Sequence, residues 1–450
     1  MQAAKLHSSD EAIMLLRFRT TNYRSIRDSC DLVMTKASFN GIRPEKGKWS
    51  EVTNRIAGIF GPNASGKTTV LDSMAFSRNA IGNSASWTTR QSFPHHPFLL
   101  DGISSSAPSI FEMDFVYTGV RHSYGFESNE RGVQAEWLHT YPEGRRRVLF
   151  EREKEDYTFG RHLKGENTRI SRLTSEMNLF LSMSAFANHP YMRGLRQFLI
   201  NHFDYAVFSE SSQNGRIRAV KKWIESDHIL RRAENLLRFA DLGIKRLSIE
   251  NVEVAEEVQR TFRKAFLAFN DESDNEKAEE AFTDFLKEQQ VQIGFWHEGG
   301  GDDKAYQLDI NKESSGTVAW LALALPALRI VDMGGTFFVD EIDASLHPRL
   351  TSALISLFKS DELNPKGAQL VFTSHDTSLM GHLTGETLDA EEIWFAEKAN
   401  DGSTEIYPLT DFQVKPDHNV ERRYLGGRYG AIPSISWEDL QVSLLEDAQA

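Results

Sequence analysis

The chain has 450 residues and a mass of 51.1 kDa, and its hydrophobic and charged fractions of 40% and 26% exclude a chain that is disordered throughout. Its formal net charge of −13 requires that any contact with nucleic acid use a local basic patch. One cysteine, Cys30, excludes a disulfide scaffold and a cysteine-built zinc or iron–sulfur site, and it favours a cytoplasmic location.

The amino-terminal third of the chain reads mainly as strands. The polar residues 1–13 predict a disordered tail, and the apolar segments that follow, within residues 15–34, predict an opening β-hairpin at a sheet edge. Residues 56–60 form a continuous apolar run, which is typical of a buried parallel strand, and a helix is predicted to begin at Thr68. Alternating apolar residues from Phe111 onward predict an antiparallel meander. We therefore expect residues 14–150 to form the first part of an α/β domain.

The middle of the chain has a different pattern. Residues 151–290 are heavily charged, with apolar residues at three- and four-residue spacing, which predicts an inserted helical region. Its acidic stretch, residues 271–280, is typical of a solvated surface. The longest apolar run, residues 318–328, is too short to span a bilayer, so we expect no membrane contact.

Strands return in residues 291–450, which are predicted to complete the α/β domain. They alternate with helices, as in a parallel sheet. The expected fold class is therefore α/β, with an antiparallel β meander and a parallel sheet on either side of a helical insertion. The predicted strands are Ile293 to Trp296, Tyr306 to Ile310, Thr336 to Val339, Leu370 to Thr373, Ile393 to Phe395 and Thr404 to Tyr407.

A phosphate-binding loop follows the strand at residues 56–60. It matches the pattern G-x-x-x-x-G-K-S/T between a buried strand and a helix. Backbone amides of such a loop surround a polyphosphate, Lys67 reaches the β and γ phosphates, and the Thr68 hydroxyl suits Mg²⁺. The sequence therefore predicts a nucleotide with Mg²⁺ at this loop. The loop is Gly61-Pro62-Asn63-Ala64-Ser65-Gly66-Lys67-Thr68.

Three further segments carry chemistry. An apolar strand ends in Asp340 and Glu341, where the first carboxylate suits a metal and the second suits a water molecule. Ser315 and Gly316 open an apolar helix and offer free amides and a hydroxyl to an anion, although an ordinary helix cap has the same pattern. Another apolar strand ends at His375, a position that is more often structural when it stands alone.

The order of these segments resembles the ABC-type ATPase heads of transporters, SMC proteins and the OLD family. The resemblance implies that residues 314–317 are the signature motif, Asp340 the Walker B acid, Glu341 the general base and His375 the switch histidine. It also implies that residues 344–348 are the D-loop. It further implies that the signature of one chain contacts the nucleotide on the Walker loop of another. A homodimer or higher oligomer with composite ATP sites is therefore expected.

A narrower resemblance is to bacterial AAA-family, ABC-type ATPases of the RloA kind. It rests on residues 22–26, the phosphate loop, residues 340–348 and the tail Tyr424-Leu425-Gly426-Gly427-Arg428-Tyr429-Gly430-Ala431-Ile432-Pro433. It adds Arg24 and Thr69 to the expected nucleotide-binding residues, and Gln91 is the candidate Q-loop ligand of the metal. Such ATPases are similar to the sensor subunits of phage-defence systems, which work with a separate effector, often a TOPRIM-type nuclease.

Two other functions remain open from sequence. A DNA-repair ATPase similar to RecF or SMC-type heads would bind duplex DNA through a basic stretch, whereas a nucleotide-gated scaffold would hardly hydrolyse ATP. The tail motif reads as a glycine-rich surface loop or as a contact of Arg428 with an anion or partner. The basic stretch contains Arg216, Arg218, Lys221, Lys222, Arg231 and Arg232, with Trp223 among them.

Overall fold

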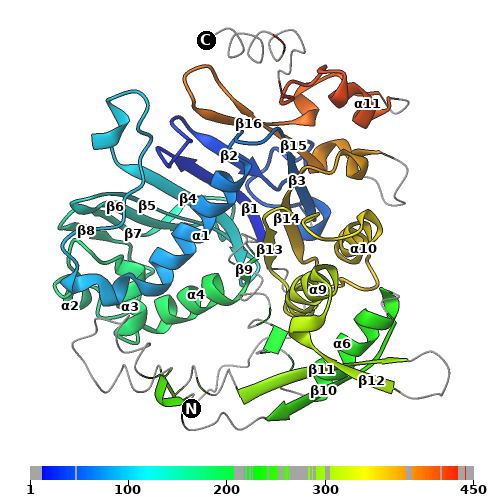
Figure 1. Cartoon of the computed structure of the whole chain (residues 1–450). Coiled ribbons are helices and arrows are strands. Elements are labelled where there is room, and N and C mark those ends of the chain that lie inside the picture. The colour runs from blue at the N-terminus through cyan, green and yellow to red at the C-terminus, as the bar shows by residue number, and fades with distance from the viewer. Residues whose placement is uncertain are drawn as a thin grey trace, which may run out of the picture. The chain divides into compact units, whose positions relative to one another are not determined.

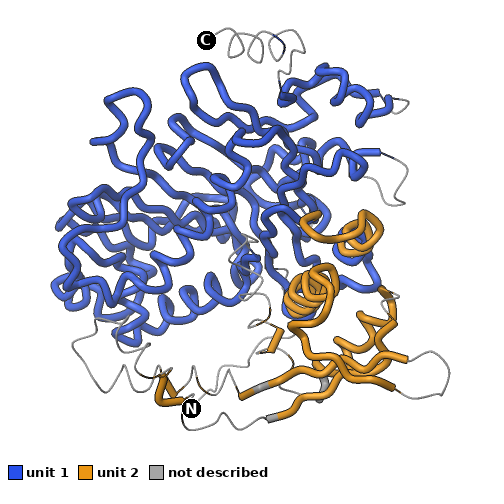
Figure 2. The backbone as a smooth tube through the Cα atoms, viewed as in Figure 1, with its two compact units in different colours: residues 1–206, 330–342, 355–450 blue, residues 207–329, 343–354 orange. Residues whose placement is uncertain are grey.

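The chain divides into two compact units, which are described separately below (Figure 2). The first unit comprises Met1–Ala206, Ile330–Ile342 and Ile355–Ala450, and the second comprises Val207–Arg329 and Asp343–Leu354. Nearly all of the expected disordered tail lies outside the described residues. The computed structural model describes residues 13–45, 48–206, 217, 220–221, 224, 227–240, 243–251, 257, 259–261, 263, 282–283, 286, 290–298, 305–381, 388–415, 418–433 and 441.

A six-stranded sheet forms the centre of the first unit (Figure 1). Five of its strands are parallel and only β16 is antiparallel, so the carboxyl ends of the five share one edge. At that edge Phe60 is paired with Ser374, and Val339 with Phe372. The order is β16 (Thr404–Pro408), β15 (Ile393–Lys398), β3 (Ile56–Phe60), β14 (Gln369–Ser374), β13 (Thr336–Val339) and β9 (Phe203–Ala206).

A seven-stranded antiparallel sheet is the second layer of this unit. It confirms the predicted hairpin at a sheet edge and the meander that follows the first helix. The predicted fold class, an antiparallel meander with a parallel sheet, is therefore confirmed. The order is β2 (Cys30–Val33), β1 (Met14–Thr21), β4 (Ser109–Tyr117), β5 (Val120–Asn129), β6 (Gly132–Thr140), β7 (Arg147–Glu153) and β8 (Asp156–Phe159).

Helix α1 (Lys67–Asn83) joins the cores of the two sheets. Its Leu71 and Met74 are buried in one hydrophobic cluster that includes Phe18 of β1 and Phe338 of β13. Burial of this kind stabilises a domain by about 25 cal/mol for each Å² of apolar surface. The other helices of the unit are α2 (Asn167–Ser171), α3 (Phe180–Phe186), α4 (Pro190–Asn201) and α11 (Val420–Leu425), with short 3-10 helices η1 (Trp49–Glu51), η2 (Ser84–Thr89), η3 (Ser104–Ser106), η5 (Thr377–Met380), η6 (Ala390–Glu392) and η7 (Leu409–Asp411).

The second unit contains a three-stranded antiparallel sheet in the order β10-β11-β12. Its core joins Phe295 of β11, Leu237 of α6 and Leu321 of α9. Helix α9 is long and apolar enough to cross a membrane, but 72% of that stretch is buried, as in the core helix of a folded unit. Helices α9 and α10 begin in the second unit, and their last residues belong to the first unit. The elements are α6 (Asp227–Phe239), β10 (Ile244–Asn251), β11 (Val291–Glu298), β12 (Ala305–Asp309), η4 (Ile310–Lys312), α9 (Ser315–Met333) and α10 (Pro348–Lys359).

Two sequence expectations differ from this structure. The segment from residue 151 to residue 206, expected to begin the helical insertion, folds with the first unit, because β7 and β8 extend the meander and β9 pairs with β13. Strands β11 and β12 were expected in the parallel sheet, but they pair antiparallel in the second unit. Their short apolar patterns indicated strands without indicating the strands with which they pair.

Candidate functional site

The carboxyl edge of the parallel sheet gathers most of the residues singled out above. Segments that follow β3, β13 and β14 leave the sheet at this edge, and they carry Lys67, Asp340 and His375. In open α/β sheets, ligands bind outside the carboxyl ends of the strands. The fold therefore provides a site where the sequence patterns predict one.

The loop after β3 has the tight geometry of a phosphate cradle. Gly66 has φ +97° and caps α1, a conformation that favours glycine, and a Cβ on Gly61 would collide with the carbonyl oxygen of Ala396. The Lys67 ammonium is buried, with Nζ 2.8 Å from the carbonyl oxygen of Gly61 and 2.9 Å from that of Pro62. The lysine is thereby held over the loop that it follows.

Hydroxyl groups of residues that are far away in sequence contact this loop and the first turn of α1. Thr404 Oγ1, at the start of β16, lies 3.0 Å from the carbonyl oxygen of Ser65 and 2.8 Å from Ser25 Oγ. Ser25 Oγ in turn lies 3.1 Å from Thr69 Oγ1, and the Thr404 amide donates to the carbonyl oxygen of Ser25 at 2.7 Å. The loop and the first turn of α1 are therefore tied to β16.

The carboxylate of Asp340 meets the start of α1. Asp340 is 6% exposed, and its Oδ1 accepts hydrogen bonds from Thr68 Oγ1 at 3.2 Å and from Thr373 Oγ1 at 2.6 Å. A hydroxyl and a carboxylate at this separation, beside a phosphate cradle, form a ligand set that suits Mg²⁺. The structure thus brings together Lys67, Thr68 and Asp340.

Glu341 is held in an uncommon backbone conformation. Its φ is +49°, and its amide donates to Thr373 Oγ1 at 2.7 Å while the next amide, of Ile342, donates to the Thr373 carbonyl oxygen at 3.0 Å. Positive φ at a non-glycine residue costs about 1–3 kcal/mol and persists where neighbouring contacts enforce it. The chain turns sharply after Asp340, and Glu341 is left half-buried at the sheet edge.

His375 follows β14 at the same edge. The preceding Ser374 is fully buried, whereas the His375 side chain is exposed. Its neighbour Asp376 caps η5 by accepting a hydrogen bond from the Ser378 amide at 2.9 Å. The strand end and the cap fix the backbone on both sides of the histidine.

The residues present fit a triphosphate with Mg²⁺. The Ser65 hydroxyl is buried in the loop and makes no hydrogen bond with any described residue. The first amides of α1, a 17-residue helix, have no partner within the helix and carry the positive end of its dipole. Mg²⁺ commonly uses one or two protein oxygens plus phosphates and water, and Thr68 Oγ1 and Asp340 Oδ1 supply two such oxygens.

Arg24 and Thr69 lie beside this cradle. Arg24 pairs with Asp72 of α1 at 2.8 Å, one helical turn after Thr68. Tyr23 donates to the same carboxylate at 3.0 Å, and burial, followed by the nearby Asp72 charge, raises the pKa of Tyr23. The turn that contains Arg24 is thus fixed against the first two turns of α1.

Gln91 is the predicted Q-loop ligand of the metal. It is exposed and follows η2, while Phe93, two residues later, donates from its amide to the carbonyl oxygen of Glu130 and packs on Trp87. His96, five residues after Gln91, accepts a hydrogen bond from the Arg24 amide at 2.6 Å, so the chain returns to the Arg24 turn after Gln91. The role of Gln91 as a metal ligand stays a prediction. The strand next to β13 is β9, and the segment after it, from residue 207, lies outside the described residues.

The expected signature residues lie in the second unit. Ser314 caps α9, with the Thr317 amide donating to Ser314 Oγ at 3.1 Å, so part of this motif is an ordinary helix cap. Ser315 is exposed, and a Cβ on Gly316 would come within 3.1 Å of the carbonyl oxygen of Ser345 in the expected D-loop. The signature and the D-loop are therefore in contact within one unit.

The basic stretch proposed for DNA falls mostly outside the described residues. Lys221, Arg231 and Arg232 are described, and Arg231 is exposed. DNA contact through this stretch therefore stays a prediction. The residues that lie outside it are Arg216, Arg218, Lys222 and Trp223.

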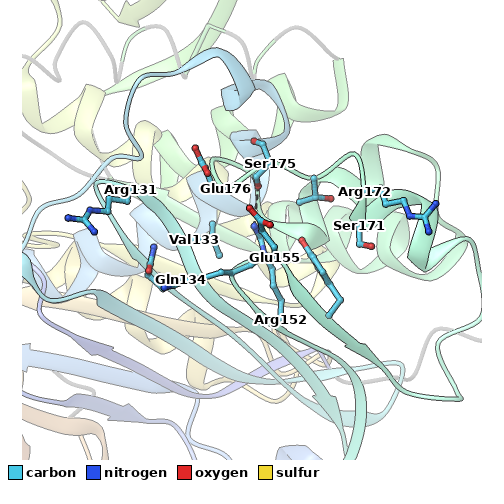
Figure 3. Close-up of a pocket in the computed structure, with 12 residues that line it drawn as sticks. Arg131, Val133, Gln134, Arg152, Glu155, Ser171, Arg172, Ser175 and Glu176 are labelled. Atoms are coloured by element: carbon cyan, nitrogen blue, oxygen red, sulfur yellow. Dashed lines mark hydrogen bonds between the residues drawn. The ribbon is translucent and has the colours of Figure 1, made fainter.

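A pocket of about 690 Å³ lies elsewhere in the first unit, between β6–β8 and the turn after α2 (Figure 3). Arg131 and Arg172 point away from its middle on opposite sides, and the buried Arg152 donates to the carbonyl oxygen of Ser175 at 3.1 Å. The lining has four basic residues, Arg131, Arg152, Lys154 and Arg172, and two acidic ones, Glu155 and Glu176. The pocket shares no residue with the phosphate cradle, and its mixed charge selects no class of ligand.

Comparison with known proteins identifies the family. Residues 56–381, which make up more than half of the chain, match the family described as "AAA domain, putative AbiEii toxin, Type IV TA system". The chain belongs to this AAA-domain family. The matched range runs from β3 to the end of the His375 segment, so it includes Lys67 and Asp340.

Solved structures similar to this AAA-domain protein include two SMC heads. One is an SmcHead bound to the C-winged helix domain of ScpA, with 14% identity, a TM-score of 0.42, and 87% of this chain and 96% of that chain covered. The other is an Smc head domain with an extended coiled coil, bound to the C-terminal domain of ScpA derived from Pyrococcus furiosus, with 13% identity, a TM-score of 0.38, and 89% and 97% covered. No curated protein matches the chain.

Two threonines of this AAA-domain site were missed from sequence. Thr373 stands in the strand-end segment that contains His375, and a polar residue in an apolar strand was an available signal. Thr404 carries no signal, because it opens an ordinary strand more than 300 residues from the loop that it touches.

Proposed function

We propose that this AAA-domain protein binds ATP with Mg²⁺ at the carboxyl edge of its parallel sheet and hydrolyses it. One observation carries the proposal: Thr68 Oγ1, directly after the phosphate-loop lysine, is 3.2 Å from the buried Asp340 carboxylate. A phosphate cradle and an acidic metal ligand thus meet although the two residues are far apart in sequence. This convergence supports nucleotide chemistry over a merely structural loop.

Each residue has a role in the proposed reaction. Lys67 binds the β and γ phosphates in exchange for its two loop carbonyls, and Thr68 and Asp340 hold Mg²⁺. Bound Mg²⁺ supplies Lewis-acid stabilisation of the phosphate charge. Glu341 accepts a proton from water as the water oxygen bonds to the γ phosphorus, and the bond from that phosphorus to the β–γ bridging oxygen breaks to give ADP and phosphate. His375 hydrogen-bonds the γ-phosphate.

Steady-state ATP hydrolysis tests the assignment of the base. Glu341→Gln should slow turnover by roughly 10²- to 10⁴-fold while ATP remains bound. Glu362→Gln is the matched control, because Glu362 is an exposed acid in the turn before β14, at the opposite edge of the sheet. Normal turnover in the Glu341→Gln protein would show that another group is the base.

We also propose that ATP joins two copies of the chain. The signature helix start and the phosphate loop each occur once per chain, and exposed Ser315 at the start of α9 suits a phosphate of another copy. Light scattering on Glu341→Gln protein with ATP and Mg²⁺ should give twice the 51.1 kDa mass of one chain. A single-chain mass at saturating ATP would contradict a shared site.

We further propose a defence role of the RloA kind, in which this chain is the regulatory subunit and a separate effector, of the nuclease class, does the damage. The family description names a putative toxin and a TA system, which supports a two-component system. Co-expression with the products of neighbouring genes should protect cells from phage, and Lys67→Ala should abolish protection. Growth arrest caused by this chain alone would assign the toxic activity to the chain itself.

A further inference from the structure

The segment that carries His375 is fixed by local hydrogen bonds after β14. The Asp376 amide donates to Ser374 Oγ at 2.9 Å, and the Ser378 amide donates to Asp376 Oδ1 at 2.9 Å. Helix η5 therefore begins directly behind the histidine. These bonds all lie within the segment and do not by themselves fix its position against the rest of the unit.

Helix α11 supplies a contact from outside the segment. Thr377 Oγ1, at the start of η5, donates to Glu421 Oε1 at 3.2 Å. At the other end of η5, Gly381 lies so close to the Glu421 carboxylate that a Cβ would collide with it. One side chain of α11 therefore touches both ends of η5.

Aromatic rings of α11 and of the tail after it stack on the parallel sheet. Tyr424 stacks on Phe395 of β15 with 5.2 Å between ring centroids and an angle of 8° between planes. Tyr429 stacks on the same ring at 5.7 Å. Because β15 pairs with β3, the strand that leads into the phosphate loop, α11 is attached to the sheet that positions Lys67.

The glycine-rich tail closes around these rings. Gly427, Gly430 and Ala431 have φ values of +74°, +71° and +50°, and the Tyr424 hydroxyl donates to the carbonyl oxygen of Ala431 at 2.7 Å. Backbone conformations of this kind persist where the surrounding structure enforces them. The tail motif thus has an internal role, which is to hold Tyr424, and with it α11, in place.

We infer that Glu421 is a positioning residue for His375. By holding Thr377 and Gly381, it fixes the backbone from which His375 reaches the γ-phosphate, and the tail motif fixes Glu421. The inference rests on the proposed ATPase activity. Its chemical basis is that loss of precise placement lowers the rate of the chemical step more than it weakens substrate binding.

Hydrolysis kinetics of matched variants test this role. Thr377→Val keeps the shape of the side chain but removes the donor to Glu421, and it should lower kcat about tenfold with KM unchanged. Glu421→Ala should do the same, whereas Thr377→Ser, which keeps the hydroxyl, should regain most of the rate. Glu405→Ala is the control, because it removes an equal charge from an exposed position of β16.

A double-mutant cycle separates positioning from general destabilisation. If Glu421 acts through His375, adding Thr377→Val to His375→Ala should lower kcat no further, whereas damage to the fold would multiply the two losses. Turnover of Thr377→Val equal to wild type, or multiplied losses, would overturn the inference and leave the proposed function intact. A wild-type chain that hydrolyses no ATP would overturn both.

Discussion

Thr404 occupies the space that a side chain on Gly66 would need. A Cβ on Gly66 would collide with the Thr404 side chain, whose Oγ1 also lies 3.0 Å from the carbonyl oxygen of Ser65. The left-handed backbone of Gly66 and the position of Thr404 therefore enforce each other. The shape of the phosphate loop depends on β16, a strand that contributes no residue to the loop itself.

Replacement of Thr404 should weaken nucleotide binding. Thr404→Val keeps the branched shape but removes the hydroxyl beside Ser25 and Ser65. The loss of a buried hydrogen bond costs about 1–3 kcal/mol. If the whole of this free energy is lost from ATP binding, the Kd for ATP rises by roughly 5- to 150-fold. Thr404→Ser keeps the hydroxyl and should bind ATP more tightly than Thr404→Val. Equal affinities of the two variants, measured with a fluorescent ATP analogue, would contradict the role of the hydroxyl.

Thr373 should matter for the rate of hydrolysis more than for binding. Its hydroxyl donates to Asp340 and accepts from the Glu341 amide, so Thr373→Val removes the partner of that amide and one of the two hydrogen bonds to Asp340 Oδ1. We expect kcat to fall by about 10- to 100-fold with a smaller change in ATP affinity. Single-turnover hydrolysis with pre-bound ATP measures the chemical step directly. An unchanged single-turnover rate would mean that the turn does not depend on Thr373.

The buried His122 should make the folded state sensitive to acid. Its Nδ1–H donates to the Val120 carbonyl oxygen at 2.8 Å, and Nε2 accepts from the Tyr191 hydroxyl at 2.6 Å, a neutral form that uses both nitrogens. Burial lowers the pKa of His122 from 6.5 to about 4. As the pH falls from 6.5 to 4, the unfolded chain takes up a proton that the folded chain excludes. The contribution of neutral His122 to the free energy of unfolding is therefore complete above pH 6.5, and it decreases by about 3 kcal/mol as the pH falls to 4.

Urea unfolding at several pH values measures this loss. His122→Gln removes the titrating group, so its free energy of unfolding should fall less steeply than that of wild type between pH 6.5 and pH 4. His162→Gln, at an exposed histidine, should retain the wild-type slope. Equal slopes for wild type and His122→Gln would contradict the burial effect.

The phosphate loop and Asp340 could be predicted because their patterns are contiguous in sequence and follow mainly apolar strands, which are fully buried in the structure. Thr404 and Ser25 could not, since their role arises only when β16 and the β1–β2 turn pack against the loop. The helical insertion was placed too early because β8 and β9 are four-residue strands without a clear alternating pattern.

The proposed function depends most on ATP binding by the loop that ends in Lys67 and Thr68. Equilibrium titration of the full chain with ATP and Mg²⁺ measures this binding directly. We predict one nucleotide per chain for the wild type and an affinity at least about 100-fold lower for Lys67→Ala, because the variant loses a buried charge that faces the phosphates. A Lys67→Ala protein that binds ATP as tightly as wild type, or a wild-type protein that binds none, would contradict the account.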